Sequence, residues 1–302
     1  MWEFEGLFDA EINPDDDSLT AQFWKDEKTG IKLGRMGYRR RTTKAGNRIE
    51  AEVYPVFGRA DRSKARAAKR NATPEAMQKV NVERSARRLS QLIEANFTEK
   101  DVAMGLNYEG TPPDDDRVRK DLRNFLNKVK RQREKKGLPE LKYIYAIGGD
   151  EMPSPGYSGK RPHVHLILSG GIERDALEEI WKKNNPGHGA TNCDRLQPND
   201  DGLEGLARYL MKQRFDRPEK KNAKKWSRSR NLTEPQRKTT DCKISNGRVK
   251  RIAFDFLNHA KETMEKLYTG YDLKDCRVRY SDVVDGVYIR CVLRKRKGGL
   301  PK

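Results

Sequence analysis

Between residues 100 and 213, short runs of apolar residues take turns with segments in which apolar residues recur every three or four positions. Short runs rich in apolar and β-branched residues indicate strands, whereas apolar residues three or four positions apart indicate amphipathic helices. The expected strands cover 101–108, 141–147, 161–168 and 190–196, and the expected helices cover 118–136, 172–183 and 202–213. This β-α-β-β-α-β-α order predicts an α+β fold of the ferredoxin-like (split βαβ) type, with an antiparallel sheet backed by helices.

The flanking residues predict additions to this fold. Two strand-like runs within 36–57 flank the turn signal Lys44-Ala45-Gly46-Asn47, which indicates a β-hairpin. Helices are expected over 59–95 and 254–268, and closing strands over 283–284 and 287–293. Residues 1–30 are acidic and are expected to form a mobile or loosely docked arm. The expected parts are an arm, hairpin and basic helices in 1–95, the split βαβ domain in 96–213, and a basic connection with a C-terminal α/β extension in 214–302.

The charge balance points to a polyanionic partner. The 302 residues contain 64 Lys and Arg against 45 Asp and Glu, a net charge of +19. Because no basic amphipathic membrane helix stands out, we expect nucleic acid rather than a membrane. No apolar run approaches the ~20 residues of a membrane span. The four cysteines form no C-x-x-C pair, so neither a thiol zinc site nor a disulfide framework is expected, and a reducing cytoplasm fits.

The segment 224–230 combines basic residues with one aromatic side chain. Such a composition is typical of a contact with a nucleic-acid strand, where base stacking supplements phosphate neutralisation. The alternative is a disordered linker. The residues concerned are Lys224, Lys225, Trp226, Arg228 and Arg230.

Two of the four histidines share one strand face. His163 and His165 are two residues apart in an expected strand, so both imidazoles project to the same side. At this spacing two imidazoles can share one metal ion. The alternative is a pair of polar side chains facing solvent. Of the other two histidines, His188 is expected in a loop and His259 on the late helix without partners.

An acidic pair precedes this strand. Glu151 is our choice of third metal ligand, with Asp150 in reserve, because an antiparallel neighbour can bring a carboxylate beside both imidazoles. Two neutral imidazoles and one carboxylate suit Mg²⁺ or Mn²⁺ with open positions for phosphate oxygens. The alternative is that the acids only open a polar turn.

The helix expected over 202–213 carries a candidate nucleophile. Tyr209 lies off its apolar face, Gly205 one turn earlier leaves the phenol uncovered, and Lys212 is its neighbour on the helix surface. A tyrosine in this setting can act as a nucleophile, and an adjacent ammonium favours the phenolate or steadies a phosphate. The alternative is a structural tyrosine at the edge of an amphipathic helix.

These motifs resemble those of a known family. His163-Val164-His165 is similar to the His-hydrophobic-His signature of the HUH endonucleases, and Tyr209-Leu-Met-Lys212 resembles their Tyr-x-x-Lys motif. The tyrosine follows the histidine pair, as in the rolling-circle replication-associated proteins of bacterial phages, plasmids and integrated elements. In the strand that resembles the family's first motif, 105–108 departs from the more apolar, threonine-bearing pattern. The supporting stretches are Asn96-Phe97, Asp194-Arg-Leu-Gln-Pro198, Gly205-Leu-Ala-Arg-Tyr209 and Lys225-Trp-Ser-Arg-Ser-Arg-Asn231.

The resemblance implies an origin-nicking and strand-joining enzyme in the cytoplasm of a bacterial host. It implies that Tyr209 attacks single-stranded origin DNA to form a 5′-phosphotyrosine, assisted by Lys212, while Arg208 contacts DNA. The metal, Mg²⁺ or Mn²⁺, is then held by His163, His165 and Glu151. No G-x-x-x-x-G-K-[ST] loop is present, which leaves a host helicase as a candidate partner. Two other hypotheses are a single-stranded DNA transposase with the same chemistry and a non-catalytic nucleic-acid-binding module.

Overall fold

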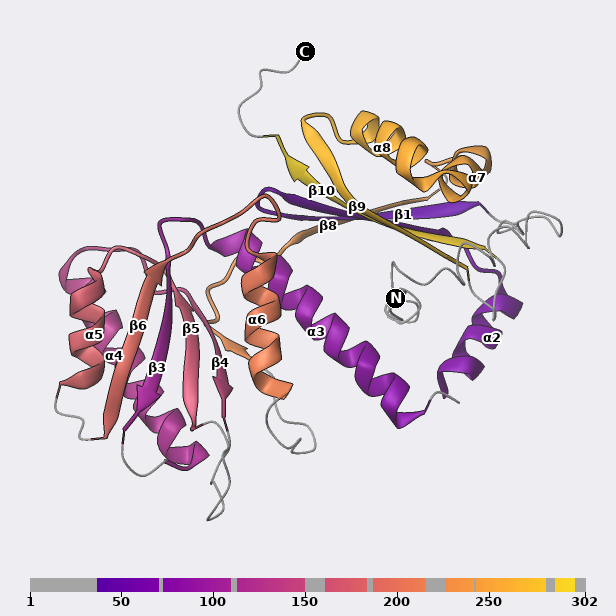
Figure 1. Cartoon of the computed structure of the whole chain (residues 1–302). Coiled ribbons are helices and arrows are strands. Elements are labelled where there is room, and N and C mark those ends of the chain that lie inside the picture. The colour runs from indigo at the N-terminus through magenta and orange to yellow at the C-terminus, as the bar shows by residue number, and fades with distance from the viewer. Residues whose placement is uncertain are drawn as a thin grey trace. The chain divides into compact units, whose positions relative to one another are not determined.

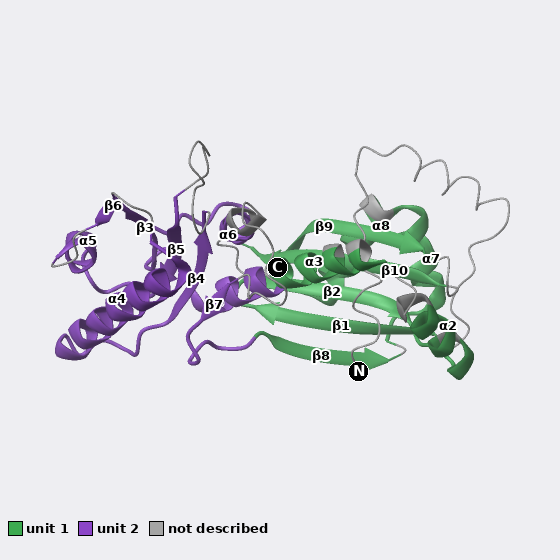
Figure 2. Cartoon of the chain, turned by 90° about the horizontal axis from the view of Figure 1, so that it is seen from below, with its two compact units in different colours: residues 1–87, 235–302 green, residues 88–234 purple. Residues whose placement is uncertain are grey.

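The computed structural model divides the chain into two compact units, each built on an antiparallel five-stranded sheet. Unit 1 comprises Met1–Arg87 and Pro235–Lys302, and unit 2 comprises Arg88–Glu234 (Figure 2). The residues that the structure describes are 37–70, 73–109, 113–149, 161–183, 187–215, 226–241, 243–280 and 286–296. The expected acidic arm, 1–30, lies outside them. In this described part no helix is long and apolar enough to cross a membrane.

Unit 2 contains the predicted ferredoxin-like arrangement (Figure 1). Its sheet has the order β6-β3-β5-β4-β7 with antiparallel pairing throughout. The first four of these strands, with α4 and α5, form the split βαβ pattern, which confirms the predicted fold class. In chain order the elements are β3 (Val102–Tyr108), α4 (Asp115–Lys135), β4 (Tyr143–Gly148), β5 (His163–Leu168), α5 (Arg174–Lys182), β6 (His188–Arg195), α6 (Glu204–Phe215) and β7 (Ser227–Arg228).

Amphipathic helices explain which face of this sheet is covered. α4 begins at its N-cap Asp114, whose side chain accepts a hydrogen bond from the backbone N of Arg117. The apolar sides of α4 and α5 are buried against alternate residues of β3 and β5, including Leu106, Val164 and Leu166. Since alternate strand residues face opposite ways, positions 163 and 165 of β5 point to the other face of the sheet. His165 contacts Tyr209 of α6 there.

The sheet of unit 1 contains strands from the early part and from the late part of the chain, in the order β8-β1-β2-β10-β9. The predicted hairpin is confirmed, with a turn at Gly46 between β1 and β2. Its apolar face packs under α7 and α8. The elements are β1 (Tyr38–Ala45), β2 (Arg48–Pro55), α2 (Arg59–Arg70), β8 (Gln236–Asp241), α7 (Asn246–Phe254), α8 (Phe256–Leu267), β9 (Tyr271–Tyr280) and β10 (Val287–Lys295). The helix α3 (Pro74–Asn96) belongs to unit 1 up to Arg87 and to unit 2 from Arg88.

The structure differs from the expected division and from some expected elements. We expected domain boundaries after residues 95 and 213, whereas the boundaries along the chain fall within α3, after Arg87, and after Glu234. The reason is that β1 pairs with β8 and β2 pairs with β10, and both partners come much later in the chain. The expected connection 214–250 includes β7, β8 and the start of α7. The expected helix 254–268 starts at Phe256, after α7, and β9 was not expected. Positions 283–284 lie outside the described residues.

Candidate active site

The histidine pair occupies a strand in the interior of the unit 2 sheet. His163 and His165 are half-buried on the α6 side of β5, with ring centroids 4.8 Å apart. Their cross-strand neighbours are small: Gly148 lies opposite His163, and Ala146 and Gly105 flank His165. On the two adjacent strands the imidazoles therefore have only small side chains directly beside them.

One of the two rings is held in a defined tautomer. The Nδ1 atom of His163 lies 2.7 Å from the backbone oxygen of Arg161. Because a carbonyl oxygen only accepts, Nδ1 carries the hydrogen in this bond, and Nε2 of the neutral ring keeps its lone pair. A backbone carbonyl that orients an imidazole in this way is a common support for a metal-ligating histidine.

The neighbouring strand β4 has no side chain next to the Nε2 atom of His163, because Gly148 is the residue at that position. A Cβ atom added to Gly148 would lie 2.6 Å from Nε2 of His163 and 3.0 Å from Cε1. Any larger residue at position 148 would therefore displace the imidazole from the place that it occupies. The two imidazoles and this cradle suit part of a divalent-metal site, and the metal itself stays a prediction.

The structure brings Tyr209 to the histidine pair. The ring centroids of Tyr209 and His165 are 4.9 Å apart, at an interplanar angle of 80°. Tyr209 is 47% exposed, so its phenol is accessible. Buried Leu203, Ala207 and Leu210 anchor α6, while a Cβ added at Gly205 would meet nothing within 4 Å. The histidine pair of β5 and Tyr209 of α6, which α5 and β6 separate along the chain, thus meet at one place.

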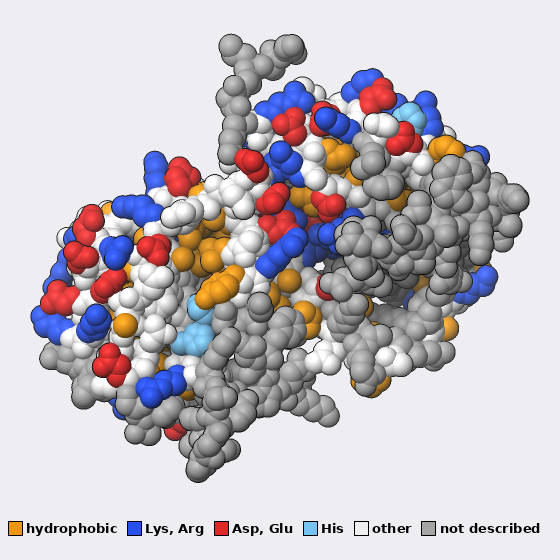
Figure 3. Space-filling view, in the orientation of Figure 1, with side chains coloured by type: hydrophobic (Ala, Val, Ile, Leu, Met, Phe, Trp, Pro, Cys, Tyr) orange, Lys and Arg blue, Asp and Glu red, His pale blue; other side chains and the backbone are white. Residues whose placement is uncertain are grey.

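This place is a cleft of about 520 Å³. On the space-filling surface, histidine side chains lie exposed next to hydrophobic ones on this unit (Figure 3). Side chains from three strands and one helix contribute to the lining. They include Asn107 of β3, His163 and His165 of β5, Asn192 and Asp194 of β6, and Tyr209 of α6.

The polar residues of β6 were not predicted as part of the site. Asn192 and His165 pair with Gly105 from opposite sides, so only a glycine separates them across the sheet. The alternation around Cys193, which is fully buried, is the sequence signal that places Asn192 and Asp194 on the cleft side. Burial raises the pKa of the Cys193 thiol to about 11, so this thiol stays protonated at neutral pH.

Several predicted site residues lie outside the described residues. These are Glu151 and Asp150, together with Lys224 and Lys225. Lys212 belongs to α6 by its backbone, but its side chain is also outside the described part. Among the residues that the structure describes, no group of three or more His, Cys, Asp or Glu side chains is placed to hold a metal ion. The predicted third ligand therefore stays a prediction.

The predicted DNA contacts that are described lie on α6 and around β7. Arg208 is exposed, and its Nη2 atom lies 2.7 Å from Oε1 of Glu204. Arg228 belongs to β7, which pairs with β4 at the sheet edge, and it forms an ion pair with Glu234 at 2.7 Å. Trp226 directly precedes β7 and Arg230 is exposed. Of this stretch, Ser227–Arg228 forms a short edge strand in place of the disordered linker that was the alternative.

His188 is a structural residue, and its predicted loop position is wrong. It begins β6, and its side chain is buried and stacked on Trp181 with ring centroids 3.8 Å apart. Its Nδ1 atom lies 2.9 Å from the Trp181 oxygen, and Nε2 lies 3.2 Å from Oδ2 of Asp121. Those groups belong to the layer with α4 and α5, which places His188 away from the cleft.

Comparisons of the chain with protein-family models, with curated proteins and with solved structures gave no match.

Proposed function

We propose that the protein is a metal-dependent enzyme of the HUH type that nicks and joins single-stranded DNA to start rolling-circle replication. The observation that carries this proposal is the contact between Tyr209 and His165, whose ring centroids are 4.9 Å apart in one open cleft. A tyrosine nucleophile has to lie beside the groups that bind the scissile phosphate. The geometry of the cleft supports this requirement.

In the proposed reaction the phenol oxygen of Tyr209 attacks the scissile phosphorus in line. The new bond joins the tyrosine to the 5′-phosphate, the bond from phosphorus to the 3′ oxygen breaks, and the phenol proton ends on the released 3′-OH. One phosphodiester is exchanged for another, so no ATP is consumed. Joining is the reverse reaction, in which a 3′-OH attacks the phosphotyrosine.

The residues of the cleft divide the remaining work. His163, oriented by the Arg161 carbonyl, and His165 would hold Mg²⁺ or Mn²⁺ with Glu151 as third ligand. When bound, the ion supplies Lewis-acid polarisation of the phosphate oxygens. Lys212, three positions after Tyr209 on α6, is assigned to neutralise the phosphate. Binding of the DNA strand is assigned to Arg208 on α6 and to residues near β7. These are the basic residues Lys224, Lys225, Arg228 and Arg230 and the aromatic Trp226.

A covalent-adduct assay tests the proposal. Purified protein is incubated with Mn²⁺ and a library of single-stranded oligonucleotides, and adducts are separated under denaturing conditions. The wild type should form an adduct, and Tyr209→Phe should form none. Tyr280→Phe is a matched control, because Tyr280 is also an exposed tyrosine but belongs to unit 1. Adducts that persist in Tyr209→Phe would refute the nucleophile assignment.

The histidine role needs a separate variant. The double change His163→Ala and His165→Ala should abolish the adduct while single-strand binding, followed by fluorescence anisotropy, stays near the wild-type value. Wild-type nicking by this variant would remove the metal role. A transposase would select the ends of its element in place of an origin, and a non-catalytic binding module would give no adduct. Bacterial cytoplasm as the location and a host helicase as partner belong to the same proposal.

A further inference from the structure

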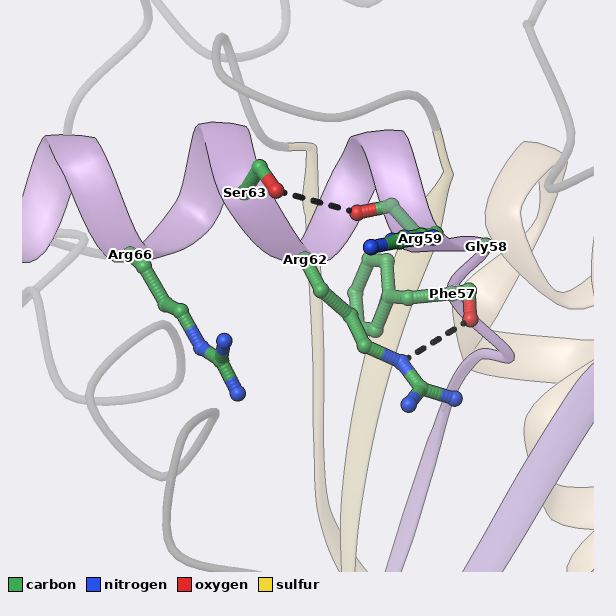
Figure 4. A pocket seen from close by; sticks show the side chains of 6 residues that line it. All are labelled: Phe57, Gly58, Arg59, Arg62, Ser63 and Arg66. Carbon is green, nitrogen blue, oxygen red and sulfur yellow. Dashed lines mark hydrogen bonds between the residues drawn. The ribbon is translucent and has the colours of Figure 1, made fainter.

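A second cleft, which is lined by arginines, lies in unit 1 beside the helix α2. It is formed where β2 ends and α2 begins, and it has a volume of about 720 Å³. Arg59, Arg62 and Arg66, which we call the arginine face, project from one side of the helix along this cleft (Figure 4). Their spacing of three and four residues puts them on one helix face. The remaining lining residues are Phe57, Gly58 and Ser63.

The arginine face is held on a firm support. Phe57 is buried and stacks on Tyr288 with ring centroids 6.4 Å apart, and Ala65 of α2 packs against this pair. The Nε atom of Arg62 donates to the Phe57 carbonyl at 3.2 Å, which orients its guanidinium (Figure 4). The terminal guanidinium nitrogens of Arg62 take no part in that bond. A guanidinium fixed through Nε presents those nitrogens as a fork to an acceptor.

The charge of α2 favours an anionic ligand. Its sequence, RADRSKARAAKR, has six basic residues against one acidic residue. The described lining contains no carboxylate, and its one aromatic ring, Phe57, is buried. A site for bases of a single strand would offer an exposed ring for stacking. The arginines suit phosphate groups, which guanidinium binds in a bidentate manner.

We propose that the arginine face of α2 binds the sugar-phosphate backbone of double-stranded DNA. Arg59 and Arg66 are about 10 Å apart along the helix axis at ~1.5 Å per residue. That length matches roughly three phosphates of one strand, at ~3.4 Å of duplex axis per phosphate. Contacts of this kind do not depend on base sequence. Only the choice of DNA as the partner rests on the proposed function, in which the nick is made within a largely duplex molecule.

The test compares two triple variants of the full chain. The first, Arg59→Gln/Arg62→Gln/Arg66→Gln, removes the arginine face. The second, Arg119→Gln/Arg123→Gln/Arg131→Gln, removes the same charge from exposed positions of α4 in unit 2. Binding of a fluorescein-labelled 30-base-pair duplex of arbitrary sequence is measured by anisotropy between 50 and 200 mM KCl. The same variants are tested on a single strand of the same length.

The first variant should bind the duplex on the order of tenfold more weakly than the second, with a salt dependence lower by about 2 to 3 in slope. Its single-strand adduct formation should equal that of the wild type. Equal duplex affinity of the two triple variants would overturn the inference, and so would a loss confined to single-strand binding. If the triple variant does not fold, Arg59→Gln/Arg66→Gln keeps the Arg62 bond to Phe57 and should show two thirds of the slope change.

The two proposals fail separately in these assays. If Tyr209→Phe retains the adduct, the nicking mechanism is wrong while duplex binding by the arginine face is unaffected. If the arginine variants bind duplex normally, the surface assignment is wrong while the Tyr209 chemistry stands.

Discussion

At the scale of single residues, the missing side chain of Gly148 determines the position of His163. The backbone of Gly148 does not adopt a left-handed conformation, so alanine is compatible with the backbone there, and the nearest obstacle is the imidazole at 2.6 Å from the added Cβ. Space, and not conformational freedom, therefore requires glycine.

Gly148→Ala should accordingly impair the site without unfolding the protein. We expect the initial rate of Mn²⁺-dependent adduct formation to fall at least about tenfold, because a catalytic group displaced by ~1 Å costs up to ~100-fold. Gly105→Ala is the matched control, since its added Cβ meets only the Asn192 oxygen at 4.0 Å. Similar losses in the two variants would mean that Gly148 has no special relation to His163.

A second residue-scale prediction concerns two cysteines. Cys276 of β9 and Cys291 of β10 lie directly opposite each other, with Sγ atoms 3.3 Å apart. Paired Cα atoms of antiparallel strands are within the range that a disulfide spans. The contact with Cys276 and burial hold the pKa of Cys291 well above its usual range, so the half-buried Cys276 should react first with an oxidant.

Hydrogen peroxide should convert this pair to a disulfide. Peroxide oxidises the Cys276 thiol to a sulfenic acid with release of water, and the Cys291 thiol then displaces a second water to form the S–S bond. Intact mass spectrometry should show the loss of two hydrogen masses, reversed by dithiothreitol. Cys276→Ser should lack this change. A disulfide that includes Cys193 would contradict the prediction.

At the scale of elements, Asn96 joins three segments of unit 2. Its Oδ1 atom accepts from the backbone N of Thr233 at 2.7 Å and from Nζ of Lys142 at 3.1 Å. Its Nδ2 atom donates to the oxygens of Leu92 and Thr233. The end of α3, the start of β4 and the segment after β7 are therefore tied by one amide.

Asn96→Ala should lower the free energy of unfolding by about 1 to 3 kcal/mol, because several hydrogen bonds are lost together. Urea denaturation followed by circular dichroism measures the change. Asn124→Ala, at an exposed position of α4, should stay within about 0.5 kcal/mol of the wild type. Equal destabilisation by the two changes would show that the amide does not join the elements energetically.

Local periodicity was sufficient for most elements but not for their long-range partners. Helix α4 was predictable because Val118, Leu122 and Phe125 repeat at helical spacing, and β5 because Val164, Leu166 and Leu168 alternate. β9 was missed because charged residues interrupt its apolar pattern. The division into units was missed because the pairing of β2 with β10 joins distant segments, and sequence spacing carries no signal for such pairing.

The site shows the same limit. The shared face of His163 and His165 follows from strand alternation, and the accessibility of Tyr209 follows from its place off the apolar side of its helix. That Tyr209 lies beside the histidine pair cannot be predicted from these local patterns, because the position of α6 next to β5 depends on how the whole sheet packs. Gly148 and Asn192 were missed because their roles depend on cross-strand register, which a single sequence does not specify.

At the scale of the whole molecule, each unit has its own buried core. Leu166 belongs to the core of unit 2 and Ile289 to that of unit 1, and both are at most 1% exposed. Proteins with separate cores commonly unfold in more than one step.

We therefore expect two calorimetric transitions that respond to different substitutions. Leu166→Ala and Ile289→Ala should each destabilise by about 2 to 5 kcal/mol. Each should shift only the transition of its own unit. A single transition that both variants shift by the same amount would show that the two cores unfold as one.

The insertion of unit 2 between the two parts of unit 1 has a consequence for synthesis on the ribosome. Val53 of β2 pairs with Ile289 of β10, so the sheet of unit 1 cannot close until β10 has been translated. At ~5–20 residues per second this interval is roughly 10 to 50 seconds. Unit 2 is one uninterrupted segment of the chain and can fold during that time, while the edge of β2 that later pairs with β10 stays unpaired. Glu50 and Glu52 bind Arg87 in the folded protein, and Glu50 also binds Arg290, which follows Arg87 much later in the chain. Charged residues on such an edge discourage pairing with another nascent chain.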